Sequence, residues 1–212
     1  MGIDHLGWNI LTLGFLGTML FSILGAWGLW LQNLSVWKNK SGKSVSVSYF
    51  SFFIAYFLSG LIYGLDKGLL ALTIHCIGRL TFGIPILIGL WKFKIFTLQE
   101  KILCYLFWGG IAISLWFSIK EQAFMLYSVG SIFAYLLQAI EIFKNKDSGR
   151  VVSKLHWVYF GSASFWTIYG FANNDLVLKA TSPPNILIAL LIIVLCHKYK
   201  KPISKVSEQP IS

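Results

Sequence analysis

Three side chains in the apolar parts of this sequence could bind a small molecule: Arg79, Trp166 and Asn185. A guanidinium group removed from water pairs through two hydrogen bonds with a carboxylate or a phosphate. The flat face of an indole ring can stack on a sugar or on another ring, and a side-chain amide both donates and accepts hydrogen bonds. Together these residues would suit a sugar, an amino acid or a small organic anion.

Each of the three also has a structural interpretation. Arg79 could bind backbone carbonyl groups or another helix, Asn185 could join two helices, and Trp166 could pack in an interface. Arg79 lies about thirteen residues before Lys92, near the middle of an apolar segment at ~1.5 Å per residue. A lone arginine inside a membrane is costly unless it faces water or a partner, so a functional role is favoured for Arg79.

The composition of the chain is that of a membrane protein. Of its 212 residues, 56% are hydrophobic and only 12% are charged, which excludes an ordinary soluble domain. Seven apolar segments have roughly the length of a membrane span, ~20 residues. They are residues 12–36, 46–65, 69–91, 102–119, 123–143, 156–172 and 176–196.

The positive charges alternate along the chain. Fourteen of the 18 Lys and Arg residues fall in four segments: 38–43, 92–101, 144–154 and 198–205. The segments between them are nearly neutral, which is the pattern of an odd number of spans with the N-terminus outside and the C-terminus in the cytoplasm. We therefore expect a multi-pass protein of the plasma membrane or a bacterial inner membrane. Its basic loops would contact anionic lipid head groups and would not bind nucleic acid.

The sequence repeats itself at an offset of about 106 residues. The matching segments are 31–40 with 137–146, 62–64 with 168–170 and 91–94 with 197–200; after one inserted residue, 41–46 also matches 148–153. Such a repeat in an apolar chain indicates a transporter built from two copies of one helical bundle. The offset also aligns Arg79 with Asn185.

The repeat predicts the fold class and the topology. Span 102–119 has no counterpart, so it restores the orientation of the second copy and makes the two copies parallel. We expect an all-α membrane protein with seven transmembrane helices, in which two parallel three-helix repeats are joined by a linker helix (3+1+3). The expected divisions are a first repeat at 1–94, the linker helix at 95–121, a second repeat at 122–200 and a basic cytoplasmic tail at 201–212.

Several short motifs follow the order of a known transporter superfamily. The chain has Gln32 and Gln138 before basic loops, then Trp166 with Tyr169 and Gly170, then a Pro-Pro-Asn segment that ends at Asn185. In these features it resembles the PQ-loop and SWEET (MtN3-like) superfamily. The resemblance implies a small-solute transporter whose binding site lies between two triple-helix bundles.

The resemblance also implies which positions line the pocket and which form gates. Asn185 and Trp166 stand at pocket positions, where the first repeat has Arg79 and Gly60, and Gly60 would leave room for the arginine side chain. Gln32 and Gln138 could form an inner gate or satisfy backbone groups at a bend. Tyr63 and Tyr169 could form an outer gate or belong to an aromatic belt. Pro183 and Pro184 would loosen their helix and free backbone carbonyls.

The functional expectation is a uniporter that works by alternating access. No Asp or Glu falls near mid-membrane, and His75 is expected to be a buried neutral side chain, so proton coupling is not favoured. The alternatives are a non-transporting receptor or chaperone on the same scaffold, similar to the KDEL receptor, and a carrier of the nicotinamide riboside type. We expect no enzyme activity, no cofactor and no metal site, because no catalytic or ligand motif is present. The sequence leaves open whether the chain forms a homo-oligomer.

Overall fold

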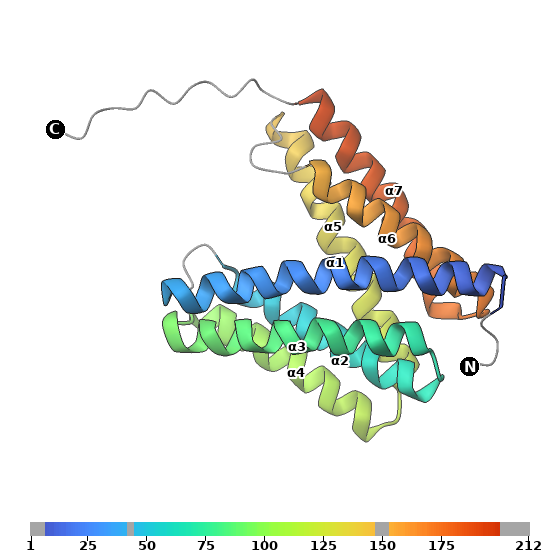
Figure 1. Cartoon of the computed structure of the whole chain (residues 1–212). Helices are drawn as coiled ribbons and strands as arrows, with labels where there is room; N and C mark the ends of the chain where they lie inside the picture. Colours follow the sequence, from blue (N-terminus) through green and yellow to red (C-terminus); the bar gives the residue numbers. More distant parts are fainter. Residues whose placement is uncertain (1–6, 42–44, 147–152, 200–212) are drawn as a thin grey trace.

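The computed structural model describes residues 7–41, 45–146 and 153–199, and all regular structure in this part of the chain is α-helical. The helices are α1 (Ile10–Asn39), α2 (Val47–Asp66), α3 (Leu70–Phe93), α4 (Leu98–Trp116), α5 (Lys120–Asn145), α6 (Ser153–Ala172) and α7 (Leu176–Lys198) (Figure 1). The prediction of an all-α chain is confirmed for the described residues. The expected tail at 201–212 lies outside them.

Helix α4 differs most from its expected position at 102–119. It begins earlier because Thr97 and Glu100 form a reciprocal capping box. The Glu100 amide donates to Thr97 Oγ1 over 3.2 Å, and the Thr97 amide donates to Glu100 Oε2 over 2.9 Å. It ends earlier because Ser118 adopts a left-handed backbone conformation with φ 54°.

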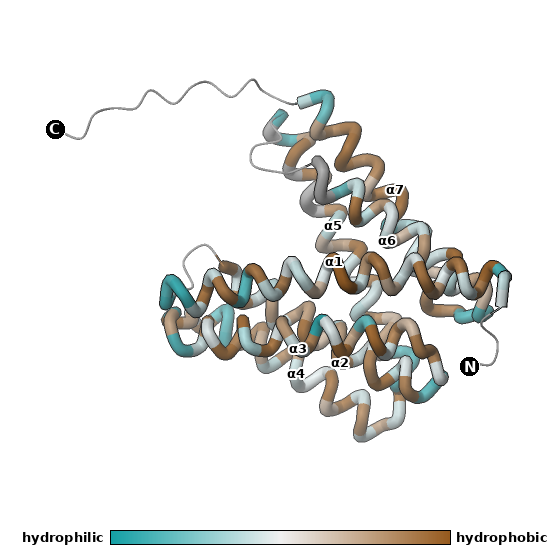
Figure 2. Tube along the Cα trace, viewed as in Figure 1, coloured by the Kyte–Doolittle hydropathy of each residue, from teal (hydrophilic) through white to brown (hydrophobic). Residues whose placement is uncertain are grey.

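Four of the helices, α1, α2, α3 and α7, are long and apolar enough to span a membrane by length and composition. A helix of 20 residues covers ~30 Å, the thickness of the hydrocarbon core. The chain was expected to have seven spans, and α4, α5 and α6 are not among these four within the described residues. Figure 2 shows apolar residues along most of the helix lengths and hydrophilic residues gathered near the helix ends.

The helices pack in two groups with the same internal arrangement. In the N-terminal triple (α1–α3), α3 contacts both α1 and α2; in the C-terminal triple (α5–α7), α7 contacts both α5 and α6. The two triples touch through α1 with α6 and through α2 with α5, and α4 packs against α2 and α5. If α1, α2 and α3 are exchanged with α5, α6 and α7, the contact of α1 with α6 becomes that of α5 with α2. The two triples therefore contact each other in an equivalent way.

The two triples meet at one end and diverge toward the other (Figure 1). At the mixed end, where α2 and α6 finish and α3 and α7 begin, one buried cluster contains Tyr63 and Tyr169 and joins both triples. At the basic end, which carries Lys38, Lys92 and Lys198, one buried cluster belongs to α1–α4 and a separate one to α5 and α7. The apolar core is therefore shared only toward the mixed end.

Glycines of α1 allow it to approach α6 closely near the mixed end. A Cβ atom on Gly17 would lie 2.0 Å from Cδ1 of Phe165, and one on Gly14 would lie 2.9 Å from the backbone nitrogen of Tyr169. Neither distance leaves room for a larger residue, so the contact between the triples depends on these two glycines.

Candidate binding cavity

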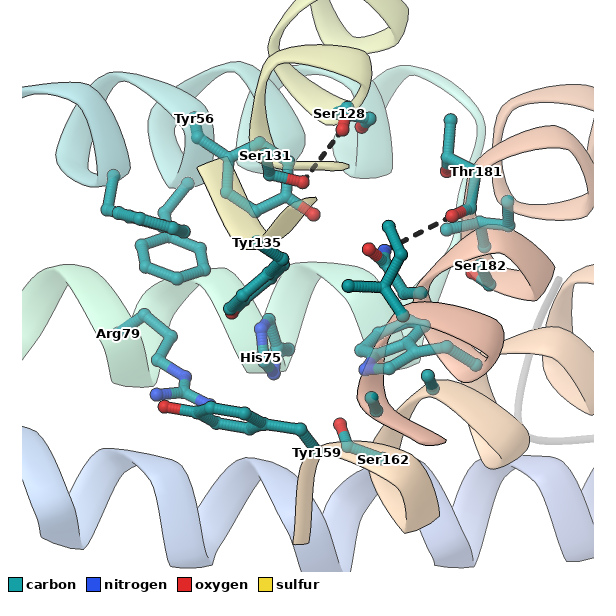
Figure 3. A pocket seen from close by; sticks show the side chains of 18 of the residues that line it. Tyr56, His75, Arg79, Ser128, Ser131, Tyr135, Tyr159, Ser162, Thr181 and Ser182 are labelled. Carbon is teal, nitrogen blue, oxygen red and sulfur yellow. Dashed lines mark hydrogen bonds between the residues drawn. The ribbon is translucent and has the colours of Figure 1, made fainter. Parts of the chain in front are cut away.

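A cavity of about 180 Å³ lies between the two triples. All helices except α4 contribute to its lining, so it belongs to neither triple alone. One water molecule needs ~10–15 Å³ of such space, which leaves room here for a small organic molecule. Figure 3 shows the polar side chains that surround this space.

Many lining residues form pairs related by the 106-residue offset of the sequence repeat. Such pairs include Phe53 with Tyr159, His75 with Thr181 and Arg79 with Asn185. In each of these pairs, the N-terminal triple supplies a ring or a basic group and the C-terminal triple supplies a hydroxyl or an amide. The cavity therefore has similar positions on its two sides but different chemistry.

Arg79 in α3 supplies a positive charge to the cavity. Its guanidinium lies over the ring of Phe57, with Cζ 5.6 Å from the ring centroid. Its Nε atom is buried and has no hydrogen-bond partner. None of the lining residues is Asp or Glu, and no ion pair involving Arg79 is found among the described residues. The guanidinium thus stands without a carboxylate partner.

The space for Arg79 is provided by Gly25 of α1. A Cβ atom on Gly25 would lie 1.8 Å from Nη2 of Arg79, so only glycine fits there without displacing the guanidinium. The expectation that Gly60 makes this room is wrong. A Cβ atom on Gly60 would lie 2.9 Å from Cys76 Sγ and 3.0 Å from Phe124 Cε2, about one helical turn closer to the mixed end, and Gly60 does not line the cavity.

Asn185 in α7 lines the other side of the cavity. Its Nδ2 donates to the carbonyl oxygen of Thr181 over 3.1 Å, and its Oδ1 is buried without a hydrogen-bond partner. Buried polar atoms are nearly always satisfied in folded proteins. Arg79, Ser128 and Asn185 thus each carry a buried polar atom in this cavity that has no partner among the described residues.

The tautomer of His75 can be assigned from its neighbours. Ser22 Oγ lies 2.6 Å from the carbonyl oxygen of Thr18 and 2.7 Å from Nδ1 of His75. Because a hydroxyl has one hydrogen and a carbonyl only accepts, Ser22 donates to Thr18 and accepts from His75. Neutral His75 then carries its proton on Nδ1, and its Nε2 remains an acceptor.

Trp166 in α6 also lines the cavity, and its ring packs edge-to-face. The centroid of His75 lies 5.1 Å away at an interplanar angle of 79°, and that of Tyr169 lies 5.9 Å away at 90°. The indole therefore helps to orient His75. Both the binding and the packing interpretations of Trp166 are compatible with this position.

Other cavity residues were not singled out from the sequence. Tyr135 and Tyr159 place hydroxyl groups near Arg79, as Figure 3 shows, and His156 lines the cavity with only 2% of its surface exposed. One signal could have found them, namely the helical spacing of polar residues in the second half. Those residues are Ser128, Ser131 and Tyr135 in α5 and Tyr159, Ser162 and Trp166 in α6.

Two tyrosines bind the triples to each other at the mixed end. Tyr63 of α2 donates to Asp175 Oδ2 over 2.7 Å, and the Tyr169 hydroxyl of α6 accepts from the backbone amide of Ala71 over 3.3 Å. Each tyrosine thus reaches the start of the third helix of the opposite triple. Both are buried, at 1% and 3% exposure, so they do not belong to a surface aromatic belt.

Surface ion pairs flank these buried hydrogen bonds. Lys67 Nζ lies 2.9 Å from Glu121 Oε2, and Lys120 pairs with Asp66. The hydrogen bond to Glu121 raises the pKa of Lys67 above its usual value. These side chains are substantially exposed, so the pairs add little stability and serve mainly to join the end of α2 to the start of α5.

The remaining expected gate residues lie elsewhere. Gln32 is partly buried in α1 and does not line the cavity, while Gln138 lies in α5 with its side chain outside the described residues. Pro183 and Pro184 lie inside α7, which continues through them to Asn185. The prolines therefore do not end the helix.

No family model, curated protein or solved structure significantly matches the chain. Within the described residues, no group of His, Cys, Asp and Glu side chains could hold a metal ion. The shape and chemistry of the cavity are therefore the basis for assigning a function.

Proposed function

We propose that the chain is a membrane transporter that moves a small polar solute through the cavity between its two triples. The observation that carries this proposal is the set of three unpartnered buried polar atoms, on Arg79, Ser128 and Asn185, that face one cavity in a largely apolar helical protein. An ionisable residue inside a membrane is costly, and it is retained where it meets a solute or a partner.

Alternating access would arise from rocking of one triple against the other. In this structure the tyrosine hydrogen bonds hold the mixed end closed. Tyr49, near the start of α2 at the basic end, lines the cavity and is 47% exposed, which supports access from that side. A transporter would also adopt the opposite state, in which the bonds of Tyr63 and Tyr169 break and the basic end closes.

The same proposal includes a 3+1+3 membrane topology, as in the PQ-loop and SWEET superfamily. The equivalent packing within the two triples supports two parallel repeats, and the position of α4 against α2 and α5 suits a linker helix. The basic end would face the cytoplasm and the mixed end the outside, because positively charged loops are retained on the cytoplasmic side.

We further propose that transport follows the solute gradient alone. None of the residues that line the cavity is Asp or Glu, so the described residues include no carboxylate there that could exchange protons with the solute. An imposed pH gradient should then have little effect on uptake into proteoliposomes. Concentrative uptake driven by pH would contradict a uniporter and would direct attention to His75.

Flux through reconstituted protein tests the proposal against a receptor that only binds. Proteoliposomes would be preloaded with unlabelled sugars, amino acids or organic anions and then supplied with the labelled form of the same compound. A transporter shows transient exchange of label above that of vesicles carrying Arg79→Gln. A receptor on this scaffold would bind one of these compounds in detergent and give no exchange.

A further inference from the structure

We infer that the solute is a hydroxylated monocarboxylate whose carboxylate binds Arg79 and whose hydroxyl binds Asn185. This inference rests on the proposed function, because it names the class of molecule for the same cavity. It follows from the number and kind of charged and polar groups that line the cavity.

One negative charge on the solute would balance the positive charge of the cavity. Among the described residues that line the cavity, Arg79 is the only Lys or Arg. His75 lies one helical turn from Arg79 on α3, where the guanidinium opposes a second positive charge. A dicarboxylate or a phosphate dianion would therefore bring an uncompensated charge out of water, which is costly.

The charges of the lining residues also disfavour zwitterions and neutral molecules as solutes. An amino acid would bring an ammonium group into a cavity where none of the described lining residues is Asp or Glu. A neutral sugar would leave the charge of Arg79, whose Nε atom is buried, without a counter-ion. A monoanion balances the charge of Arg79.

The surroundings of Arg79 suit a carboxylate. Tyr135 and Tyr159 line the same cavity as Arg79, and Figure 3 shows Tyr159 beside the guanidinium. Phenolic hydroxyls donate hydrogen bonds to a carboxylate, so both can supplement the pairing to the guanidinium. The two tyrosines come from α5 and α6, which draws the C-terminal triple toward an anion held on α3.

The other polar atoms of the cavity call for a donor on the solute. Asn185 Oδ1 is an unpartnered acceptor, and Nε2 of neutral His75 is an acceptor because Nδ1 donates to Ser22. A carboxylate cannot satisfy an acceptor, and a plain hydrocarbon chain would leave both unpaired at a cost in affinity. A hydroxyl group on the solute satisfies Asn185 while the carboxylate remains on Arg79.

A matched set of compounds tests the assignment by binding in detergent, followed through tryptophan fluorescence and calorimetry. The expected ligands are lactate, glycerate and gluconate. The comparison compounds are propionate without the hydroxyl, glycerol and glucose without the charge, serine with an ammonium, and glucarate and 3-phosphoglycerate with extra negative charge. We expect at least one of the three hydroxy acids to bind about tenfold or more tightly than each of its comparison compounds.

Substitutions at two residues test which residue binds the carboxylate and which binds the hydroxyl of the solute. Arg79→Gln should weaken binding of the preferred hydroxy acid about tenfold or more, and Arg79→Lys should restore part of it, because an ammonium keeps the charge but loses the planar fork. Asn185→Leu should leave binding of propionate nearly unchanged and remove the preference for lactate over propionate. If Arg79→Gln does not fold, the affinity of Arg79→Lys and the affinities of the wild-type protein for the matched compounds still test the inference.

Failure of this inference differs from failure of the transport proposal. Tightest binding of a neutral, zwitterionic or dianionic compound, or no binding of any hydroxy acid, would overturn the inference, even if that other compound is transported. Binding of a hydroxy acid without exchange across a vesicle membrane would instead support the inference and overturn transport.

Discussion

The phenolic hydroxyl of Tyr63 in α2 donates a 2.7 Å hydrogen bond to Oδ2 of Asp175, the residue that caps the start of α7. The other carboxylate oxygen, Oδ1, accepts from the Leu178 amide over 2.8 Å. One buried carboxylate therefore both stabilises the first turn of α7 and attaches that helix to the opposite triple. Closure of the mixed end and the position of α7, which carries Asn185, are linked through Asp175.

Tyr63→Phe should weaken the closed mixed end. The change leaves Asp175 buried with one donor fewer, at a cost of ~1–3 kcal/mol. We expect a lower unfolding temperature in detergent and a larger population open at the mixed end. Tyr105→Phe is the matched control, because Tyr105 lies on α4 with 73% of its surface exposed. If both variants unfold at the same temperature as wild type, the hydrogen bond to Asp175 does not hold the triples together.

Gly25→Ala should displace Arg79 and weaken ligand binding. The added methyl group would overlap Nη2, 1.8 Å from the new Cβ, and the guanidinium must move to avoid it. We expect affinity for the bound anion to fall about tenfold or more, and tenfold corresponds to ~1.4 kcal/mol. Gly28→Ala is a control one turn along the same helix, with no atom within 4 Å of the new Cβ. Equal affinities for the two variants would show that the position of Arg79 is not critical.

Ser22→Ala should release the orientation of His75. In the wild type, nitrogen chemical shifts of labelled histidine should show the proton of His75 on Nδ1, because Ser22 accepts from that atom. Without Ser22 we expect a mixture of tautomers and weaker binding of any ligand that donates to Nε2. A wild-type spectrum with the proton on Nε2 would refute the assignment.

The orientation in the membrane can be tested with single cysteines at the two ends. In a background without the three buried native cysteines, Asn174→Cys at the mixed end should react with an impermeant thiol reagent added outside intact cells. Asn39→Cys at the basic end should react only after the membrane is opened. The opposite pattern would reverse the orientation, and reaction of both from outside would exclude an odd number of crossings between them.

The helices were predictable from the sequence because the lengths of the apolar segments and the internal repeat can be read directly from it. Six of the seven begin and end within a few residues of the expected segments, and α4 is shifted because a capping box at Thr97 determines its start. The 106-residue offset also paired Arg79 with Asn185, and the structure brings both to one cavity. Periodicity and repetition are thus sufficient for the elements and for part of the site.

What the sequence did not predict depends on how the helices face one another. Gly25 and Gly60 are equally plausible neighbours of Arg79 by composition, and only the rotation of α3 toward α1 selects Gly25. The hydrogen bond from Tyr63 to Asp175 joins residues 112 positions apart, so no local sequence pattern predicts it. Long-range pairs of this kind are decided by packing between the triples.

Transport by this chain requires that one cavity opens in turn to both sides of the membrane. A single cysteine in place of Ser162, which lines the cavity, tests it directly with an impermeant thiol reagent applied to one side at a time. We expect fast reaction from the basic side and slower reaction from the mixed side. Adding Tyr63→Phe should increase the reaction rate only from the mixed side. Reaction from the basic side alone, unchanged by Tyr63→Phe, would contradict it and identify the cavity as a closed-ended binding site.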